Sequence, residues 1–480
     1  MKSMHTPLRT VISSAVLSIL ATGAAHSAAF ALYGEGNAAA TGNYGAGLAA
    51  EAADASIGWY NPAGLVLIRD QQLVFGGVGV FPRSTVSGSS NFITQNPISP
   101  SLPPLVYGQT FDNLATEKDA LVPSLHYALP LGENTTFGLS LTSPFGLATN
   151  WAPDSPVRYE ATYTEVITTT ISPEIGARIM DNFSVGAGLD LQYARVKFNR
   201  MLGAPTLTGI LYNDPMLLDS LSYNKGSSYG IGFHAGVLGM FNENHTRIGL
   251  NYQSEVRHQF YGFSRLTGNL ATPSNIFDPL SFATGTFLSD SLFSNSIDLP
   301  QVVTLSGYQD VNDKLALLGS VIFTGWNVFQ NIQLNNVAAA VVDGSGTIIP
   351  ALVNSSSPQN YTNAWRVALG ANYHVSNQLM VRVGGGYDQT PTNDLNRDVR
   401  LPDLDRWALA IGARYQVRPN LSVDAGYTHL FGIEGQGLNR TDITGATSTY
   451  TVNASTTTSA DLVGLQLNWT IDKVPEAPMK

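Results

Sequence analysis

The chain of 480 residues contains no cysteine, and only 12% of its residues are charged. The lack of cysteine excludes disulfides, thiolate metal ligands and a cysteine nucleophile. There are 25 basic residues against 35 acidic ones, and this acidic balance argues against a nucleic-acid partner. No H-E-x-x-H motif is present, and the histidines lack metal-ligand spacing. One G-x-S-x-G match occurs, from Gly226 to Gly230, but it lies at the start of an expected strand and not at the strand-to-helix turn that a nucleophile elbow requires. We therefore expect no enzyme, no metal and no cofactor.

Long apolar runs are also scarce, and the single candidate for a membrane helix lies at the N-terminus. Residues 11–25 are apolar, follow Lys2 and Arg9, and lead into Ala25-His26-Ser27. The run is shorter than the ~20 residues of a membrane helix and has the three-part pattern of a secretory leader. The sequence therefore predicts a Sec signal peptide over residues 1–27.

Residues 28–68 resemble neither a strand nor a long helix. Glycine and alanine dominate this segment, whose charged residues are Glu35, Glu51 and Asp54. The segment closes on Asn61-Pro62-Ala63, where Asn61 can cap a helical turn that begins with proline. We interpret this small, turned segment as a plug, here called the hatch, inside the structure that the rest of the chain forms.

The rest of the chain alternates between apolar and polar residues. From Phe183 to Ala194 the odd positions are mostly large and apolar, and the even positions are mostly small or polar. The same phase recurs over 365–373, 381–387 and 407–415. Such strands place one face against lipid and the other against a lumen, which is typical of a transmembrane β-barrel.

The spacing of the links predicts the number of strands. Six short polar links are expected at residues 131–134, 181–182, 242–245, 312–314, 376–378 and 418–420. Seven long loops are expected at residues 82–118, 143–160, 199–226, 262–296, 330–361, 391–404 and 432–458. These links join fourteen antiparallel strands, an even number as in other bacterial barrels. We expect an all-β fold with a barrel over residues 69–471 and a C-terminal tail over 472–480.

Five motifs follow one another along the chain: Ala28 to Leu32, Asn61-Pro62-Ala63, Thr324-Gly325-Trp326-Asn327, the segment from Trp365 to Gly370, and Leu401-Pro402-Asp403-Leu404-Asp405-Arg406. In kind and in order they resemble those of the FadL-type outer-membrane transporters of long-chain fatty acids. The resemblance implies a fourteen-stranded barrel, a hatch in the lumen, and uptake of hydrophobic molecules through a lateral opening in the wall.

A break in the third expected strand is a candidate for that opening. The alternation from Phe137 to Thr142 is interrupted by Ser143-Pro144-Phe145-Gly146. Proline cannot donate a ladder hydrogen bond and glycine leaves the wall thin, so this segment could kink the strand and open a lateral gate. The alternative is that Pro144 simply ends the strand at a loop.

Two expected extracellular loops are unusually apolar. The loop at 199–226 carries Leu217 and Leu218, and the loop at 262–296 carries Phe277, Phe282 and Phe287. Apolar surfaces that face water mark binding sites, so these five residues are candidates for the first capture of substrate. The alternative is that the loops pack only on each other.

Charged residues also fall on the lumen phase of the strands, including Arg366 and Arg382. Most are expected to form a structural network, but one or two arginines could bind a carboxylate. The residues after the Trp326 motif include no lysine, whereas fatty-acid transporters of the resembling family carry one there. Long-chain fatty acids remain the first prediction for the cargo, and neutral aromatic or aliphatic hydrocarbons are the alternative.

The predicted protein is a monomer in the outer membrane of a Gram-negative bacterium, in contact with outer-membrane lipid and lipopolysaccharide. The alternatives from other classes are a lipase-like barrel enzyme and a general porin. A porin would offer an aqueous pore, through which an alkyl chain has no favourable path, since each CH₂ exposed to water costs about 0.8 kcal/mol.

Overall fold

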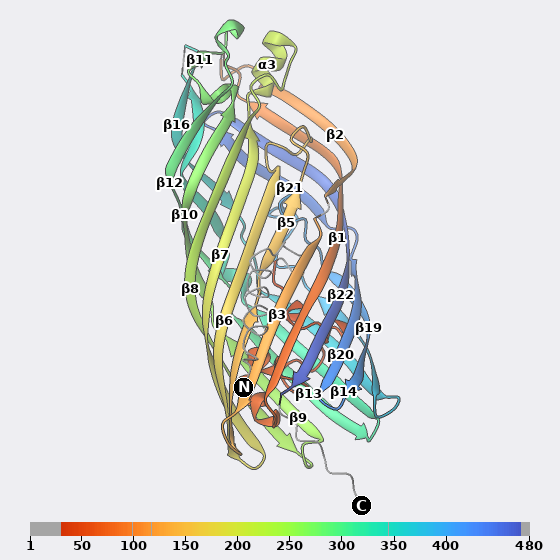
Figure 1. The fold of residues 1–480 in the computed structure, drawn as a ribbon. Helices are drawn as coiled ribbons and strands as arrows, with labels where there is room; N and C mark the ends of the chain where they lie inside the picture. Colours follow the sequence, from red (N-terminus) through yellow and green to blue (C-terminus); the bar gives the residue numbers. More distant parts are fainter. Residues whose placement is uncertain (1–29, 98, 117, 344, 472–480) are drawn as a thin grey trace, which may run out of the picture.

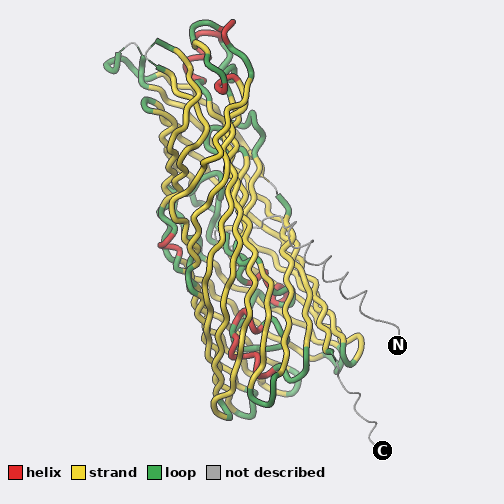
Figure 2. The backbone as a smooth tube through the Cα atoms, turned by 60° about the vertical axis from the view of Figure 1, so that its left-hand side comes forward, coloured by secondary structure: helices red, strands yellow, loops and turns green. Residues whose placement is uncertain are grey.

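The computed structural model describes residues 30–471 except 98, 117 and 344. These residues form a tall closed barrel, with strands along most of its length and helical turns enclosed in its lower part (Figures 1 and 2). The expected signal peptide, the start of the mature chain at Ala28 and the tail at 472–480 lie outside the described residues. No described helix is both long enough and apolar enough to cross a membrane.

Fourteen antiparallel strands close the barrel, as predicted. Five of them consist of two segments. In chain order they are β1 (Gln72–Thr94), β3 (Ala120–Pro130), β4 with β5 (Thr135–Thr142 and Gly146–Asn150), β6 (Tyr163–Met180), β7 (Phe183–Leu202), β8 (Ser220–Phe241), β9 with β10 (Thr246–Gln253 and Val256–Gly268), β12 with β13 (Gly285–Leu299 and Val302–Asn312), β14 with β15 (Leu315–Thr324 and Asn331–Val342), β16 with β17 (Thr347–Pro358 and Ala364–His374), β18 (Leu379–Asp388), β19 (Arg406–Arg418), β20 (Leu421–Gly432) and β22 (Ser448–Thr470). Pairing of β1 with β22 closes the wall.

Smaller elements complete the fold. At the upper end, β2 (Leu105–Thr116) extends β1 and β21 (Gly437–Gly445) extends β22 as hairpins, and β11 (Ser274–Asn275) pairs with β16. The helix α3 (Pro205–Tyr212) lies at this end too (Figure 1). The other helical elements are η1 (Gly34–Gly36), η2 (Ala40–Gly42), α2 (Ile57–Tyr60), η3 (Pro62–Leu67), η4 (Asn269–Ala271), η5 (Pro279–Ser281) and η6 (Trp326–Val328).

The upper strands are much longer than predicted. Four expected loops, at 82–118, 262–296, 330–361 and 432–458, are largely strand, because β1 continues to Thr94 and β15 and β16 fill most of 330–361. The prediction was wrong there because it ended each strand where apolar alternation ends. Above the membrane the outer face is wet, so backbone pairing can continue without an apolar face.

The lower end and the face assignments match the sequence. The strands end close to the six predicted short links, for example at Asp181-Asn182 and at Pro419-Asn420. Outward positions such as Trp365, Leu369 and Leu409 are exposed, as membrane-facing residues of a barrel should be. Inward Arg366, Arg382, Asp190, Asp388, Asp424, His126 and His234 are buried.

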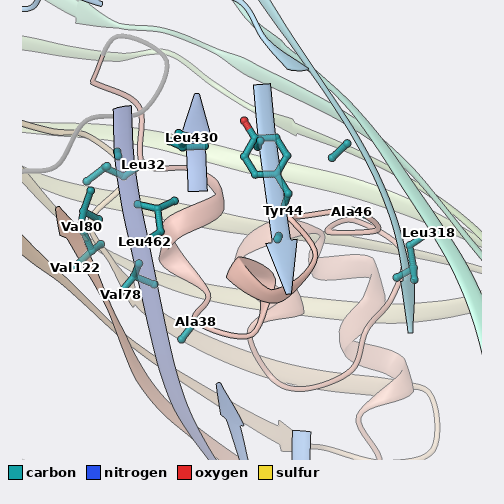
Figure 3. Packing of buried hydrophobic residues seen from close by; sticks show 14 of the residues in the cluster. Leu32, Ala38, Tyr44, Ala46, Val78, Val80, Val122, Leu318, Leu430 and Leu462 are labelled. Carbon is teal, nitrogen blue, oxygen red and sulfur yellow. The ribbon is translucent and has the colours of Figure 1, made fainter. Parts of the chain in front are cut away.

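Residues 30–68 lie inside the barrel. Leu32, Ala38, Tyr44 and Ala46 pack against inward side chains of β1, β3, β14, β20 and β22, as Figure 3 shows for Val78, Val80, Val122, Leu318, Leu430 and Leu462. Asn61 caps η3, since its side chain accepts a hydrogen bond from the Ala63 N–H at 3.1 Å. The Asn61 amide also donates to the carbonyl of Val237 in β8 at 3.0 Å, which ties the cap to the wall.

Candidate functional site

An apolar pocket lies above the hatch. Thr164, Val166 and Thr168 of β6 and Ala194, Val196 and Phe198 of β7 face it because every second residue of a strand points inward. Its volume is about 560 Å³ when the solvent space at its open side is counted. The apolar lining consists of Phe30, Leu147, Val166, Ala194, Val196, Phe198, Phe260, Ile297, Leu299, Phe329, Ile332, Tyr361 and Leu401. Such a lining can enclose an alkyl chain or an aromatic ring.

Aromatic side chains form one end of this pocket. Phe30 at the start of the described chain packs edge-on against Trp326 and Phe329, with ring centroids 4.7 and 5.4 Å apart. Trp326 belongs to η6, a short turn between β14 and β15 that directs the indole inward. Phe30 also lies 6.0 Å from Phe145 of the strand break. The N-terminal segment therefore separates the pocket from the break in the wall.

Guanidinium groups lie at the opposite, polar end. Arg400, in the loop between β18 and β19, lines the pocket beside Asp398 and Gln359. Its Nη1 is buried and has no hydrogen-bond partner among the described residues. Arg200 at the upper end of β7 lies nearby, and its guanidinium donates a long hydrogen bond to Ser355 Oγ at 3.5 Å. Both side chains have donors free for an anion.

Carboxylates flank these arginines. Glu160, in the loop before β6, lies 3.8 Å from Arg440 Nε and accepts a hydrogen bond from the Val399 N–H. Burial, reinforced by repulsion from Asp398 and Asp442, raises the pKa of Glu160 to about 8, although Arg440 and Arg400 act in the opposite direction. Glu160 is therefore mostly neutral at pH 7. The positive charge of Arg200 and Arg400 is then balanced by less negative charge than the number of nearby carboxyl groups suggests.

The pocket continues upward to an open mouth. An intermediate space shares Phe198, Ile332 and Arg400 with the pocket, and it shares Arg200 and Asp442 with the mouth. The mouth measures about 1760 Å³ including its open side. Its apolar lining includes Met201, Leu202, Ala204, Leu270, Val337, Ala339, Ala340, Val341, Val342 and Val353. The mouth, the intermediate space and the pocket therefore adjoin one another, and together they are here called the passage.

The wall beside the pocket has an unpaired seam between β3 and β5. The ladder between β3 and β4 ends at Leu125 and Leu141, and β5 pairs with β6 but shares no described ladder with β3. Pro144 interrupts the strand rather than ending it, since β5 resumes at Gly146. The hatch occupies the break, because Leu32 N–H donates to Pro144 O and Gly146 N–H donates to Phe30 O, at 2.7 and 2.8 Å.

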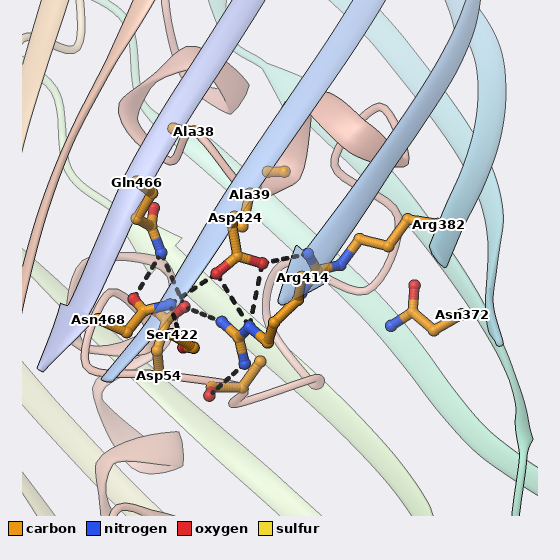
Figure 4. Close-up of polar contacts among 12 residues, drawn as sticks. Ala38, Ala39, Asp54, Asn372, Arg382, Arg414, Ser422, Asp424, Gln466 and Asn468 are labelled. Atoms are coloured by element: carbon orange, nitrogen blue, oxygen red, sulfur yellow. Dashed lines mark hydrogen bonds and ion pairs between the residues drawn. The ribbon is translucent and has the colours of Figure 1, made fainter. Parts of the chain in front are cut away.

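Below the pocket, charged residues join the hatch to the wall. Asp54 of the hatch binds Arg414 of β19 at 2.9 Å, and Arg414 also binds Asp424 of β20 (Figure 4). Arg382 of β18 forms an ion pair with Asp424 as well. Gln466 donates to Asp54 at 2.9 Å and Asn468 donates to Asp424 at 2.6 Å. This buried network is fully paired around Asp424.

The lumen arginines singled out from the sequence belong to the hatch region and do not line the pocket. Arg382 is held by Asp424, and Arg366 covers the Tyr44 ring at 4.0 Å and donates to the Tyr44 carbonyl. Both side chains already have partners that keep them in place. The residues that do reach the pocket, Arg400 and Arg200, were not singled out.

The apolar loop residues gather above the mouth. Leu218 is fully buried, with Phe282 and Phe287 packed against its cluster, and Leu217 is half-buried. Phe277 is 65% exposed, and its neighbour Leu280 is 94% exposed. The two loops therefore pack on each other and still present an apolar surface to water.

The sequence held a signal for one of the missed arginines. The inward phase of β7, read from Ser184 through Ala194, places Arg200 inward when it is continued. A loop is expected from residue 199 on the sequence alone, whereas β7 continues to Leu202, so this expectation misses the inward position of Arg200. Arg400 lies in an irregular loop whose path only the folded chain defines.

Comparison with known proteins places this barrel in a family. A family model described as outer membrane protein transport protein (OMPP1/FadL/TodX) matches residues 18–471. The chain is 28% identical to outer membrane protein P1 of Haemophilus influenzae, over 95% of this chain and 98% of that protein. It is 27% identical to the long-chain fatty acid transport protein of Escherichia coli K12, over 78% of this chain and 81% of that protein.

Solved structures share the fold. A Pseudomonas aeruginosa FadL homologue superposes with a TM-score of 0.74 at 22% identity, covering 92% of this chain and all of that one. The Pseudomonas putida toluene transporter TodX gives a TM-score of 0.64 at 14% identity, covering 93% of this chain and 100% of that one. The chain belongs to the OMPP1/FadL/TodX family of outer membrane transport proteins.

Proposed function

We propose that this protein imports long-chain fatty acids across the outer membrane. The observation that carries the proposal is an apolar pocket whose lining includes Arg400, a guanidinium with its Nη1 unpartnered among the described residues. The alkyl chain lies among Phe198, Phe260 and Leu299, where burial contributes about 0.8 kcal/mol per CH₂. The carboxylate binds Arg400, with Arg200 next along the passage.

The route follows the geometry of the passage. Fatty acid first contacts the apolar loops, enters the mouth, and reaches the pocket with its carboxylate behind. The hatch blocks the axial way below, so the cargo leaves through the seam at Ser143–Gly146 after Phe30 moves aside. The relatives named for fatty acid transport favour this cargo, and those named for toluene favour the neutral alternative.

Comparing oleate and toluene transport by the Arg400→Gln variant and the wild-type protein distinguishes a fatty-acid cargo from a hydrocarbon cargo. A charge-assisted hydrogen bond contributes about 1.5–3 kcal/mol, so oleate affinity should fall tenfold or more. Toluene gains nothing from a guanidinium, and its uptake should be unchanged. Purified protein in proteoliposomes with labelled oleate or toluene supplies the measurement.

Arg69→Gln is the matched control, because Arg69 is an exposed arginine at the lower end that bonds the Glu133 carbonyl, away from the passage. It should leave both cargoes unaffected. Oleate uptake by Arg400→Gln at the wild-type rate, with toluene transported well by both proteins, would replace the fatty-acid proposal with the hydrocarbon one.

A further inference from the structure

Four cations lie together on the outer wall of the barrel, away from the passage. They are Arg195 and Lys197 of β7, Lys225 of β8 and Arg265 of β10, here called the basic patch. Ala194 and Val196 line the pocket, so the alternate residues Arg195 and Lys197 point outward. Ser264 donates to Asn224 inside the barrel at 2.7 Å, so their neighbours Arg265 and Lys225 also point outward.

The register brings the four side chains into one area. Lys197 lies directly opposite Lys225, and Lys225 lies opposite Phe263, two residues from Arg265. The strands β7, β8 and β10 lie side by side (Figure 1). Neighbouring strands are about 4.8 Å apart, so the patch is about 10 Å wide across the strands.

The protein neutralises the basic patch only in part. Glu165 of β6 binds both Arg195 and Lys197, at 2.9 and 3.0 Å. Among the described residues, no ion pair joins Lys225 or Arg265 to a carboxylate; the next acid on this wall, Asp290, is on β12. Like charges directly opposite on paired strands are destabilising, so Lys197 beside Lys225 calls for an anion from outside the chain.

Aromatic residues fix the height of the patch relative to the membrane. Just below it on the same strands, Tyr193 and Tyr229 lie 5.2 Å apart on the outward face, and Ile231 beneath them is exposed. Aromatic girdles mark the boundary between lipid tails and headgroups. The Lys197 ammonium lies over the Tyr163 ring and the Arg265 guanidinium lies over the Tyr223 ring, 5.5 and 5.3 Å from the ring centroids, so aromatic rings are also present at the level of the patch itself. The four cations are therefore at the level of the outer-leaflet headgroups.

We propose that the basic patch binds the phosphate groups of a phosphorylated glycolipid of the outer leaflet, the lipid A part of lipopolysaccharide. The acyl chains lie against the apolar wall below Tyr193 and Tyr229. The phosphates accept hydrogen bonds from Lys197, Lys225 and Arg265 and supply the negative charge that the wall lacks. The site is independent of the cargo, since it faces lipid on the outside of the barrel.

Native mass spectrometry of the full mature protein in detergent tests the proposal. Diphosphoryl lipid A, the fully dephosphorylated lipid with the same acyl chains, and inorganic phosphate are added separately to wild type and to a variant with all four cations replaced by Gln. We expect wild type to retain diphosphoryl lipid A at least tenfold better than the variant and better than the dephosphorylated lipid. Inorganic phosphate should neither bind stably nor displace it.

Arg257→Gln is the control, because Arg257 is an exposed outward arginine of β10 already bound by Glu255 at 3.0 Å. It should retain lipid A as wild type does, and heat-modifiable mobility on gels confirms that both variants fold. The single variant Lys225→Gln, which breaks no ion pair, covers the case in which the fourfold variant misfolds. Equal lipid A retention by wild type and the folded cation variants overturns the proposal. Binding of inorganic phosphate as strong as that of lipid A shows an adventitious ion only, and also overturns it.

Discussion

Glu160 sets the charge around the polar end of the pocket. Its pKa is raised to about 8 by burial and by the nearby carboxylates of Asp398 and Asp442. Below pH 8 it is neutral, and the arginines face the cargo with less competition. Above pH 8 Glu160 is ionised, so it repels an anionic cargo and competes with the cargo carboxylate for the same guanidinium groups. Fatty-acid binding is therefore expected to weaken as the pH rises.

We predict that oleate affinity falls by about tenfold as pH rises through 8, since one nearby charge is worth about 1–2 kcal/mol at the effective dielectric of a protein. Glu160→Gln should keep the low-pH affinity across the range. Fluorescent fatty-acid titrations from pH 6 to 9.5 supply the curves, and a toluene titration should stay flat. An equally steep fall in Glu160→Gln would assign the effect to another group.

Residue-level prediction from the sequence succeeded where strand phase decides the outcome. Trp365, Leu369 and Leu409 face outward and Arg366, Arg382 and Asp424 face inward, as the alternation requires. It did not reach Arg400, whose position depends on the loop between β18 and β19 folding over the barrel. Phe30 was likewise beyond reach, since its contacts with Trp326 and Phe145 join residues far apart in the chain.

At the level of elements, the hatch and the seam form one unit. The cap residue Asn61 is fully buried, and its amide also donates to the Ala49 carbonyl at 2.8 Å. We predict that Asn61→Ala loosens η3 by about 1–2 kcal/mol, because it removes the cap and leaves two carbonyls without that donor. Brief openings in planar-bilayer recordings should become more frequent. Asn312→Ala, in a lower turn outside the lumen, is the control, and recordings as quiet as wild type would contradict a blocking role for the hatch.

The seam depends on Pro144, which lacks the N–H that a continuous strand would donate. We predict that Pro144→Thr lets the third strand run on from Thr142 and narrows the seam, so that oleate uptake falls severalfold while oleate binding in detergent is retained. Pro130→Thr makes the same change at the lower end of β3 and should leave uptake intact. Unchanged uptake by a well-folded Pro144→Thr protein would point to an exit elsewhere.

The strand count was predictable because six short links divide the chain regularly, and a link of two to four residues can only join neighbouring antiparallel strands. The upper limits of the strands were not. The upper part of β1 is mostly polar, and the upper parts of β15 and β16 are continuously apolar, so none of them shows the apolar alternation by which a strand is recognised. Strand propensity and apolar alternation identify the strand segments that face lipid. They do not identify the segments that extend above the membrane.

For the whole molecule, the passage begins at the apolar surface above the mouth. Phe277 and Leu280 are exposed there, together with Ile210 of α3, although the nearby residues Leu207, Ile276 and Phe282 pack in the loop cluster around Leu218. A monomeric soluble surface rarely keeps so many large apolar side chains in water without a binding role. Capture of cargo from dilute solution is the role that the passage below them supports.

We predict that replacing Ile210, Phe277 and Leu280 with Ser slows oleate uptake most at low cargo concentration. Losing an apolar contact of about 1.5 kcal/mol or more costs tenfold in the first binding step, whereas the pocket and Arg400 are untouched. Uptake at saturating oleate should therefore match wild type, and toluene should show the same pattern, because capture depends on apolar area and not on charge. Leu395→Ser removes an equally exposed leucine from the loop between β18 and β19 and should change neither. If the triple variant imports both cargoes at wild-type rates even at the lowest concentration, these loops do not capture substrate, and cargo enters the mouth directly from solution.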